Sequence, residues 1–229
     1  MNKESNRYTF LFSAAMVVVV AVALTVVSTV LQPLQNENAE NEKRQNILQS
    51  VKVNVSREAS REAFAVYITR QFLVNADGQE IPGDAFAVDP AKEMKKPREE
   101  RRLPVFAARV DGSTKYILPV RGAGLWGPLW GYVALNDDGN AIFGAVFDHK
   151  GETPGLGAEI TREEFRSRFD GKTIFENDAL VAVRVLKGGQ ANGPHEVDAI
   201  SGGTITSKGV ETMLKNSLAC YEPFLKSLP

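Results

Sequence analysis

The sequence is poor in the residue types that hold metal ions and form disulfides. Its 229 residues include one cysteine, Cys220, and two histidines, His149 and His195. A single cysteine excludes an internal disulfide, a cysteine-rich zinc site and an iron–sulfur cluster held by this chain alone. With so few histidines we expect no metal site. Any redox chemistry would then depend on an organic cofactor or on a partner protein.

An excess of positive charge is also missing. The 27 lysines and arginines are balanced by 28 aspartates and glutamates, which gives a formal net charge of −1. Without a basic surface field we expect no binding to nucleic acid. A Gly-x-Gly-x-x-Gly fingerprint after a strand is lacking too, so we expect this chain to read no dinucleotide. The length suits one domain of ordinary size with appendages.

Charged residues are absent from one long apolar segment, residues 8–31. As a helix it would extend roughly 36 Å, enough to cross a hydrocarbon core of about 30 Å. The alternative is a cleaved signal peptide, because Ala21-Val22-Ala23 resembles a cleavage site. However, the apolar residues continue to Leu31, beyond the usual apolar region of a signal peptide. We therefore predict an uncleaved, single-pass transmembrane helix.

The charges on either side of this segment predict its orientation. Lys3 and Arg7 precede it closely, whereas Lys43 and Arg44 follow only after an acidic stretch. Positive charges close to a span favour the cytoplasmic side. We therefore predict that residues 1–7 are cytoplasmic. The soluble part would then lie on the periplasmic, or outer, face of the bacterial inner (cytoplasmic) membrane.

Residues 32–60 are predicted to be a polar connector. Pro33 is expected to end the membrane helix, because proline cannot continue the backbone hydrogen-bond ladder. Apolar residues at helical spacing predict a short juxtamembrane helix over residues 42–51. Residues 61–229 are predicted to form the extracytoplasmic domain, with its compact part beginning near Pro104.

The domain is predicted to be α+β with a mostly antiparallel sheet. Apolar runs bounded by turn residues predict strands, and an Asp-Gly turn predicts a hairpin between the third and fourth of them. These runs are residues 105–107, 116–120, 130–135, 141–147 and 180–186. Thr161 and Glu164 form the pattern of a capping box at the start of a helix. Spacings of three and four predict the buried face of a C-terminal helix: Val210, Met213, Leu214, Ser217, Leu218, Tyr221, Phe224 and Leu225.

The stretch just before this last helix carries the first chemical motif. Residues 198–207 read Asp-Ala-Ile-Ser-Gly-Gly-Thr-Ile-Thr-Ser. Adjacent glycines allow a phosphate to approach the backbone, and the free N–H groups of a helix N-terminus favour an anion. Taken from the residues alone, a tight turn followed by a helix capped by Thr206 or Ser207 also explains the pattern.

The spacing Asp-x-x-Ser-Gly-x-Thr resembles the flavinylation motif of the FMN-binding domain family. The resemblance implies that a flavin transferase attaches FMN through a phosphoester to the last threonine, here Thr204, with Ser201 and Thr206 beside the cofactor. An unactivated hydroxyl is a poor nucleophile, so the transferase must supply the base and the metal. This chain has Gly203 where the family usually has alanine. No residue of the chain itself is expected to be catalytic.

A second loop resembles another signature of the same family. Residues 149–158 read His-Lys-Gly-Glu-Thr-Pro-Gly-Leu-Gly-Ala. The resemblance implies that Glu152, Thr153, Leu156 and Gly157 lie close to the isoalloxazine ring, with backbone N–H groups bonding the flavin carbonyls. The alternative is a plain loop between the hairpin and the next helix, with a solvated glutamate.

A third segment indicates the subfamily. Residues 124–132 read Gly-Leu-Trp-Gly-Pro-Leu-Trp-Gly-Tyr and contain both tryptophans. They resemble the C subunits of the sodium-pumping NADH:quinone reductases, and Trp126 is expected to touch the flavin or a partner. This resemblance implies an electron-transfer subunit, incomplete as an enzyme alone. The complex around it would oxidise NADH, reduce ubiquinone or another quinone, and export sodium. The alternatives are the G subunit of an Rnf-type electron-transport complex, or a membrane-anchored binding module without a cofactor.

Overall fold

The computed structural model describes residues 6–228, so the predicted cytoplasmic residues 1–5, with Lys3, lie outside the described part. The chain divides into two compact units, Met1–Lys43 and Arg44–Pro229. The described part of the first unit is helix α1, which continues into the second unit (α1, Asn6–Ser50). By length and composition α1 is apolar enough to cross a membrane, and its apolar stretch is not buried inside the protein. A signal sequence would meet the same criterion.

The prediction that Pro33 ends the membrane helix is wrong. Helix α1 continues through Pro33 to Ser50 and includes the residues predicted as a separate juxtamembrane helix. Proline removes one backbone hydrogen bond, and the glutamate-, lysine- and arginine-containing stretch behind it favours helix. The hydroxyls of Thr25 and Thr29 each donate to the carbonyl four residues earlier, at 2.8 Å, so these polar groups are satisfied within the helix.

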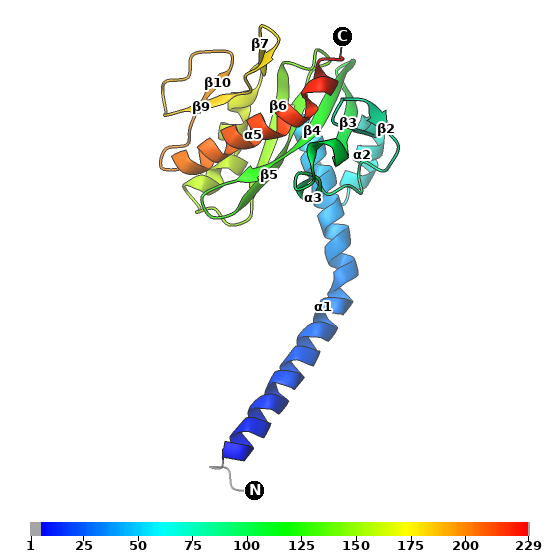
Figure 1. Cartoon of the computed structure of the whole chain (residues 1–229), viewed down its shortest axis with the longest axis vertical. Coiled ribbons are helices and arrows are strands. Elements are labelled where there is room, and N and C mark those ends of the chain that lie inside the picture. The colour runs from blue at the N-terminus through cyan, green and yellow to red at the C-terminus, as the bar shows by residue number, and fades with distance from the viewer. Residues whose placement is uncertain (1–5, 229) are drawn as a thin grey trace. The chain divides into compact units, whose positions relative to one another are not determined.

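The second unit is built on a six-stranded antiparallel sheet, which confirms the predicted α+β class (Figure 1). Its order is β2-β1-β3-β4-β5-β6. The strands are β1 (Ile68–Val74), β2 (Glu80–Ile81), β3 (Leu103–Val110), β4 (Ser113–Ala123), β5 (Pro128–Leu135) and β6 (Ile142–His149). The predicted hairpin is β5–β6, with Tyr132 opposite Val146. The compact part begins well before Pro104, since β1 and β2 belong to the sheet.

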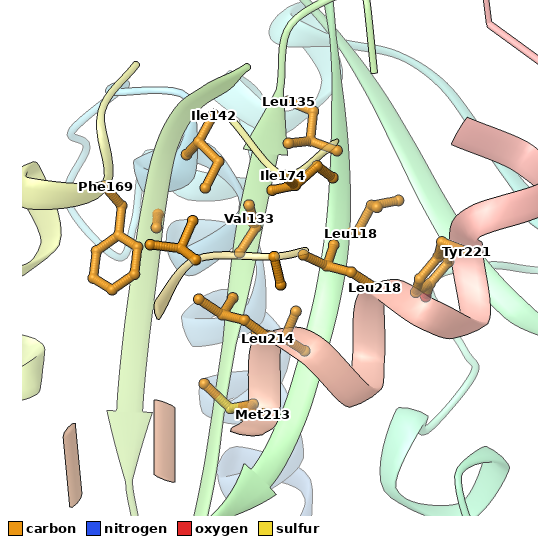
Figure 2. Packing of buried hydrophobic residues seen from close by; sticks show 14 of the residues in the cluster. Leu118, Val133, Leu135, Ile142, Phe169, Ile174, Met213, Leu214, Leu218 and Tyr221 are labelled. Carbon is orange, nitrogen blue, oxygen red and sulfur yellow. The ribbon is translucent and has the colours of Figure 1, made fainter. Parts of the chain in front are cut away.

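The alternation of side chains along the strands gives the sheet two buried faces. On one face Leu118 and Val133 pack under helix α5 (Thr204–Leu225). Figure 2 shows Leu214 and Leu218 of this helix pointing toward them. All eight residues predicted for the helix face are buried. On the other face Ile117 belongs to a cluster that includes Ile47, from the last turns of α1.

Short elements complete the fold. They are α2 (Ser60–Tyr67), α3 (Pro90–Glu93), η1 (Arg98–Glu100), η2 (Gly157–Thr161), α4 (Glu163–Arg166), η3 (Ser167–Phe169), β7 (Phe175–Glu176), β8 (Ala179–Leu180), β9 (Arg184–Leu186) and β10 (Glu196–Asp198). The strand predicted over 180–186 is split into β8 and β9, because Ala182 has a positive φ of 54°. The predicted capping box is wrong. The Thr161 hydroxyl donates to the Ala158 carbonyl inside η2 at 3.0 Å, and Arg162 precedes α4 without a side-chain cap.

Candidate functional site

The three sequence motifs meet at the side chain of Glu152. This glutamate follows β6 in the second motif and is 4% exposed. Its Oε1 accepts a hydrogen bond from the backbone N–H of Trp126 at 2.8 Å, in the turn between β4 and β5. Its Oε2 accepts a hydrogen bond from Oγ1 of Thr206 at 2.5 Å, in the first turn of α5. Segments far apart in the sequence therefore share one carboxylate.

The donors around Glu152 keep its carboxyl group ionised. Burial raises the pKa of Glu152, but the hydrogen bonds from Thr206 and from the backbone N–H groups of Trp126, Leu125 and Gly127 outweigh burial and hold the pKa below its ordinary value. The reading of Glu152 as a solvated loop residue is therefore wrong. Its own backbone N–H donates to Nδ1 of His149 at 3.1 Å, which closes the start of the loop.

Glycines leave the space that the carboxylate occupies. A methyl group on Gly124 would lie 2.5 Å from Oε1 of Glu152. One on Gly157 would lie 2.4 Å from Oγ1 of Thr206 and 2.7 Å from Oε2 of Glu152. Real Cβ atoms do not approach this closely, so these glycines belong to the geometry of the junction.

The start of α5 differs from the predicted cap. The helix begins at Thr204 with Gly203 at the N-cap and no side-chain cap. Thr206 and Ser207 lie inside the first turns instead. The hydroxyl of Ser207 donates to the carbonyl of Gly203 at 2.9 Å and accepts the N–H of Ile200 at 3.1 Å. The first N–H groups of a helix have no acceptor within it, so they point toward the position of an anion.

The four hydroxyl-bearing residues of the segment 198–207 have different environments. The hydroxyls of Thr206 and Ser207 belong to buried residues and are hydrogen-bonded within the fold. Ser201 and Thr204 are exposed. Thr204 alone of this exposed pair is a helix residue, at the first position of α5. A hydroxyl that must react with a large substrate needs this accessibility, which Thr206 and Ser207 lack.

The loop around Leu156 packs directly against the glycines of the motif. Gly202 has a positive φ of 74°, and a methyl group there would lie 2.6 Å from Cδ2 of Leu156. A methyl group on Gly203 would lie 2.9 Å from the Leu156 carbonyl oxygen. This contact gives a physical reason for glycine at position 203, where the family usually has alanine.

Exposed apolar side chains gather on the same three segments. Leu125 is 49% exposed, Trp126 70%, Leu156 43% and Ile205 62%. Outside α1, the exposed large apolar side chains of residues 51–228 are these four and Val66. Such a concentration of apolar surface marks a binding region for an apolar or aromatic group.

The backbone of the second loop is largely bonded to itself. The carbonyl of Thr153 accepts the N–H groups of Leu156 and Ala158, both at 3.1 Å. The N–H of Gly155 donates to Oε1 of Glu159 at 2.9 Å. The Leu156 N–H, expected to serve a flavin carbonyl, is therefore used inside the loop. The group that Leu156 presents outward is its side chain.

The motif is held by hydrogen bonds from two places outside it, Arg168 and the segment 190–191. Arg168, in η3, donates through Nη1 to the carbonyl of Asp198 at 2.7 Å and to that of Ala199 at 3.3 Å. The carboxylate of Asp198 accepts the N–H groups of Gln190 and Ala191, and the bond from Ala191 contributes most to lowering the pKa of Asp198. Through these bonds Asp198 holds the chain around residues 190–191 next to the motif. No local pattern around Arg168 points to its role, which depends on tertiary packing.

Comparison with known proteins identifies the group to which this architecture belongs. Residues 124–219 match the model of the FMN-binding domain. The chain is 32% identical to the C subunit of the Na(+)-translocating NADH-quinone reductase of Vibrio anguillarum, over 92% of this chain and 89% of that protein. It is 32% identical to the protein of the same name from Pseudomonas aeruginosa, over 93% and 91%.

Solved structures give the same result. The crystal structure of the C subunit of the Na(+)-translocating NADH-quinone reductase from Parabacteroides distasonis has 49% sequence identity and a TM-score of 0.82, covering 87% of this chain and 98% of that one. NqrC of Shewanella oneidensis has 30% identity and a TM-score of 0.68, covering 82% and 98%. The resemblance seen in the three sequence motifs is confirmed, and the chain belongs to the family formed by the C subunits of the Na(+)-translocating NADH-quinone reductases.

Proposed function

We propose that this protein is the electron-transfer subunit of a membrane complex that oxidises NADH, reduces a quinone and exports Na+, and that it carries FMN bonded through its phosphate to Oγ1 of Thr204. The names of the relatives and the FMN-binding match support the function and the cofactor. One observation carries the attachment site. Thr204 has an accessible hydroxyl at the start of α5, whereas the hydroxyls of Thr206 and Ser207 are buried and bonded.

The residues around Thr204 suit both ends of FMN. A phosphate on Thr204 would lie beside the free N–H groups of the first helical turn, where negative charge is favoured. The exposed side chains of Leu125, Trp126, Leu156 and Ile205 offer apolar surface to an aromatic ring system. FMN supplies a carrier that accepts and passes on electrons. The chain would hold this carrier, orient it and exclude water from part of its surface.

Attachment would transfer the FMN part of FAD to Thr204. The hydroxyl oxygen of Thr204 would attack the FMN phosphorus of FAD, forming the phosphoester. The phosphoanhydride bond of FAD would break and AMP would leave, while the hydroxyl proton passes to a base of the transferase. Because the chain places no titratable side chain within the stretch 199–207, base and metal are assigned to the flavin transferase. The transferase is thus a partner during maturation.

The two alternative functions have less support. The G subunit of an Rnf-type complex would share the flavin chemistry, but the relatives from Vibrio and Pseudomonas carry the name of the C subunit of the NADH-quinone reductase. A binding module without a cofactor is disfavoured by the FMN-binding match. With the other subunits as permanent partners, NADH oxidation would take place outside this chain, in line with the missing dinucleotide fingerprint.

Peptide mass mapping tests the attachment. Full-length protein is produced together with a flavin transferase, as the wild type and as the variants Ser201→Ala, Thr204→Ala and Thr206→Ser. We expect the FMN mass on Thr204 in the wild type, in Ser201→Ala and in Thr206→Ser. Thr204→Ala should be colourless yet folded, since an exposed hydroxyl contributes little to stability. An adduct on Thr206, or flavin that stays covalently bound in Thr204→Ala, would disprove the assignment.

A further inference from the structure

The burial of Glu152 needs an explanation beyond loop formation. Acidic side chains are rarely buried unless they are paired, because burial penalises the charged form. The hydrogen bonds that the Glu152 carboxylate receives come from the Trp126 N–H and the Thr206 hydroxyl, and its pKa is also lowered by the N–H groups of Leu125 and Gly127. All of these donors are neutral groups, backbone N–H groups and one hydroxyl. The carboxylate is therefore held by directed bonds.

The two hydrogen bonds to the Glu152 carboxylate join different segments of the chain. Oε1 holds the turn that presents Leu125 and Trp126, through the 2.8 Å bond from the Trp126 N–H. Oε2 holds the first turn of α5, through the 2.5 Å bond from Thr206, two residues after Thr204. The loop that presents Leu156 carries Glu152 itself. The apolar side chains and the exposed hydroxyl thus depend on one carboxylate for their relative positions.

Glycines next to the Glu152 carboxylate leave just the space that its two oxygens occupy. Methyl groups on Gly124 and Gly157 would lie 2.5 Å and 2.7 Å from the two carboxylate oxygens. The Trp126 side chain itself is 70% exposed, so packing does not hold it in place. The turn is closed by the bond from the Gly124 N–H to the Gly127 carbonyl at 2.8 Å, and the bond from the Trp126 N–H to Glu152 ties it to the 152–157 loop.

We propose that Glu152 is a positioning residue for the flavin. It joins the 124–127 turn, the 152–157 loop and the start of α5, and so sets where Trp126 and Leu156 stand relative to Thr204, without contacting the flavin. This inference rests on the proposed attachment of FMN to Thr204. It differs from the expectation that Glu152 lines the ring, because both carboxylate oxygens face the protein.

Substitutions at Glu152 and Thr206 separate this role from a general effect on folding. Glutamine keeps the shape of glutamate but offers one acceptor oxygen, so it cannot receive all the donors that meet here. Thr206→Val keeps the shape of threonine and removes the donor, whereas Thr206→Ser keeps the donor. Leu214→Ala, which removes a buried side chain elsewhere on α5, serves as the control for lost stability.

The first measurement uses the full-length protein in detergent, produced without a transferase. Amide hydrogen exchange is followed at the backbone N–H of Trp126. We expect exchange to become at least about tenfold faster in Glu152→Gln and Thr206→Val, because a hydrogen bond to a charged group typically contributes about that factor. Thr206→Ser and Leu214→Ala should keep the exchange rate of the wild type.

The second measurement uses the same variants after loading with FMN. We expect covalent FMN in all four, with a shifted absorption spectrum and midpoint potential in Glu152→Gln and Thr206→Val only. If Thr206→Val keeps the wild-type exchange rate at Trp126 and the wild-type flavin spectrum, the proposal is overturned. This outcome decides the question even if Glu152→Gln does not fold. A wild-type protein that takes up no flavin would instead disprove the attachment to Thr204, and exchange at Trp126 would still decide whether Glu152 orders the turn.

Discussion

Gly157 lies where any side chain would press against the Glu152–Thr206 hydrogen bond. We predict that Gly157→Ala lowers the free energy of unfolding by about 1–3 kcal/mol, the usual cost of inserting a methyl group into a packed site. Urea denaturation of the full-length protein would measure this. Gly151→Ala is the matched control in the same loop, because a methyl group there meets no atom within 4 Å and its φ is not positive. Equal stabilities of the two variants would contradict the prediction.

Glu152 should also make stability depend on pH. Hydrogen bonds hold its pKa below the ordinary value of 4.5, despite burial. A carboxyl group with a lowered pKa in the folded state stabilises the fold fully above its unfolded pKa, and the contribution disappears as the pH falls through the folded pKa. We therefore predict that Glu152→Gln flattens the loss of stability below about pH 4.5, as measured by urea denaturation from pH 7 downward. An unchanged slope would show that the pKa of Glu152 is not lowered in the folded protein.

At the scale of elements, helix α5 covers one face of the sheet through a single apolar stripe. We predict that Leu214→Ala destabilises the protein by about 2–5 kcal/mol, since Leu214 is fully buried and the change leaves a cavity. The neighbouring Lys215 is exposed, so Lys215→Ala should change stability by less than about 0.5 kcal/mol. Thermal or urea unfolding compares the two. Similar effects of both variants would mean that α5 does not pack as described.

At the scale of the whole molecule, the second unit has its own two-faced core. Removing residues 1–43 should therefore leave a protein that is soluble and folds cooperatively, because the buried apolar side chains of residues 6–228 all lie beyond residue 43. Circular dichroism and urea denaturation of residues 44–229 would test this. The full-length protein is expected in the membrane fraction. A truncated protein that is insoluble or lacks a cooperative transition would show that the first unit is needed for folding.

The orientation of the chain is a separate prediction. Arg7 adjoins the apolar segment, while the residues after it are acidic, so we expect residues 32–229 on the periplasmic side. Alkaline phosphatase fused to the C-terminus should then be active, and a reporter that works only in the cytoplasm should be inactive at the same position. The reverse result would also remove a physical reason for a covalent flavin, which is retention where no cytoplasmic pool can replace a lost cofactor.

Local sequence patterns were enough to predict the sheet class, the β5–β6 hairpin, the buried face of α5 and the apolar segment. Each of these follows from local periodicity or turn chemistry, which neighbouring residues already contain. The three motifs also pointed to FMN through resemblance. Local signals were least reliable at element ends: Pro33 was expected to stop α1 and Thr161 to cap a helix, and neither does. A helix end depends on the next residues of the chain and on the packing around them as much as on one residue.

The way in which the motifs meet depends on tertiary packing. The bond between Glu152 and Thr206 joins residues 54 positions apart, and Arg168 supports Asp198 across 30 positions. No local pattern contains such pairs, because strand order and the packing of α5 bring them together. The same packing buries the hydroxyls of Thr206 and Ser207 and leaves that of Thr204 exposed. Accessibility, which separates these hydroxyls, is a property of the folded chain and not of the residue type.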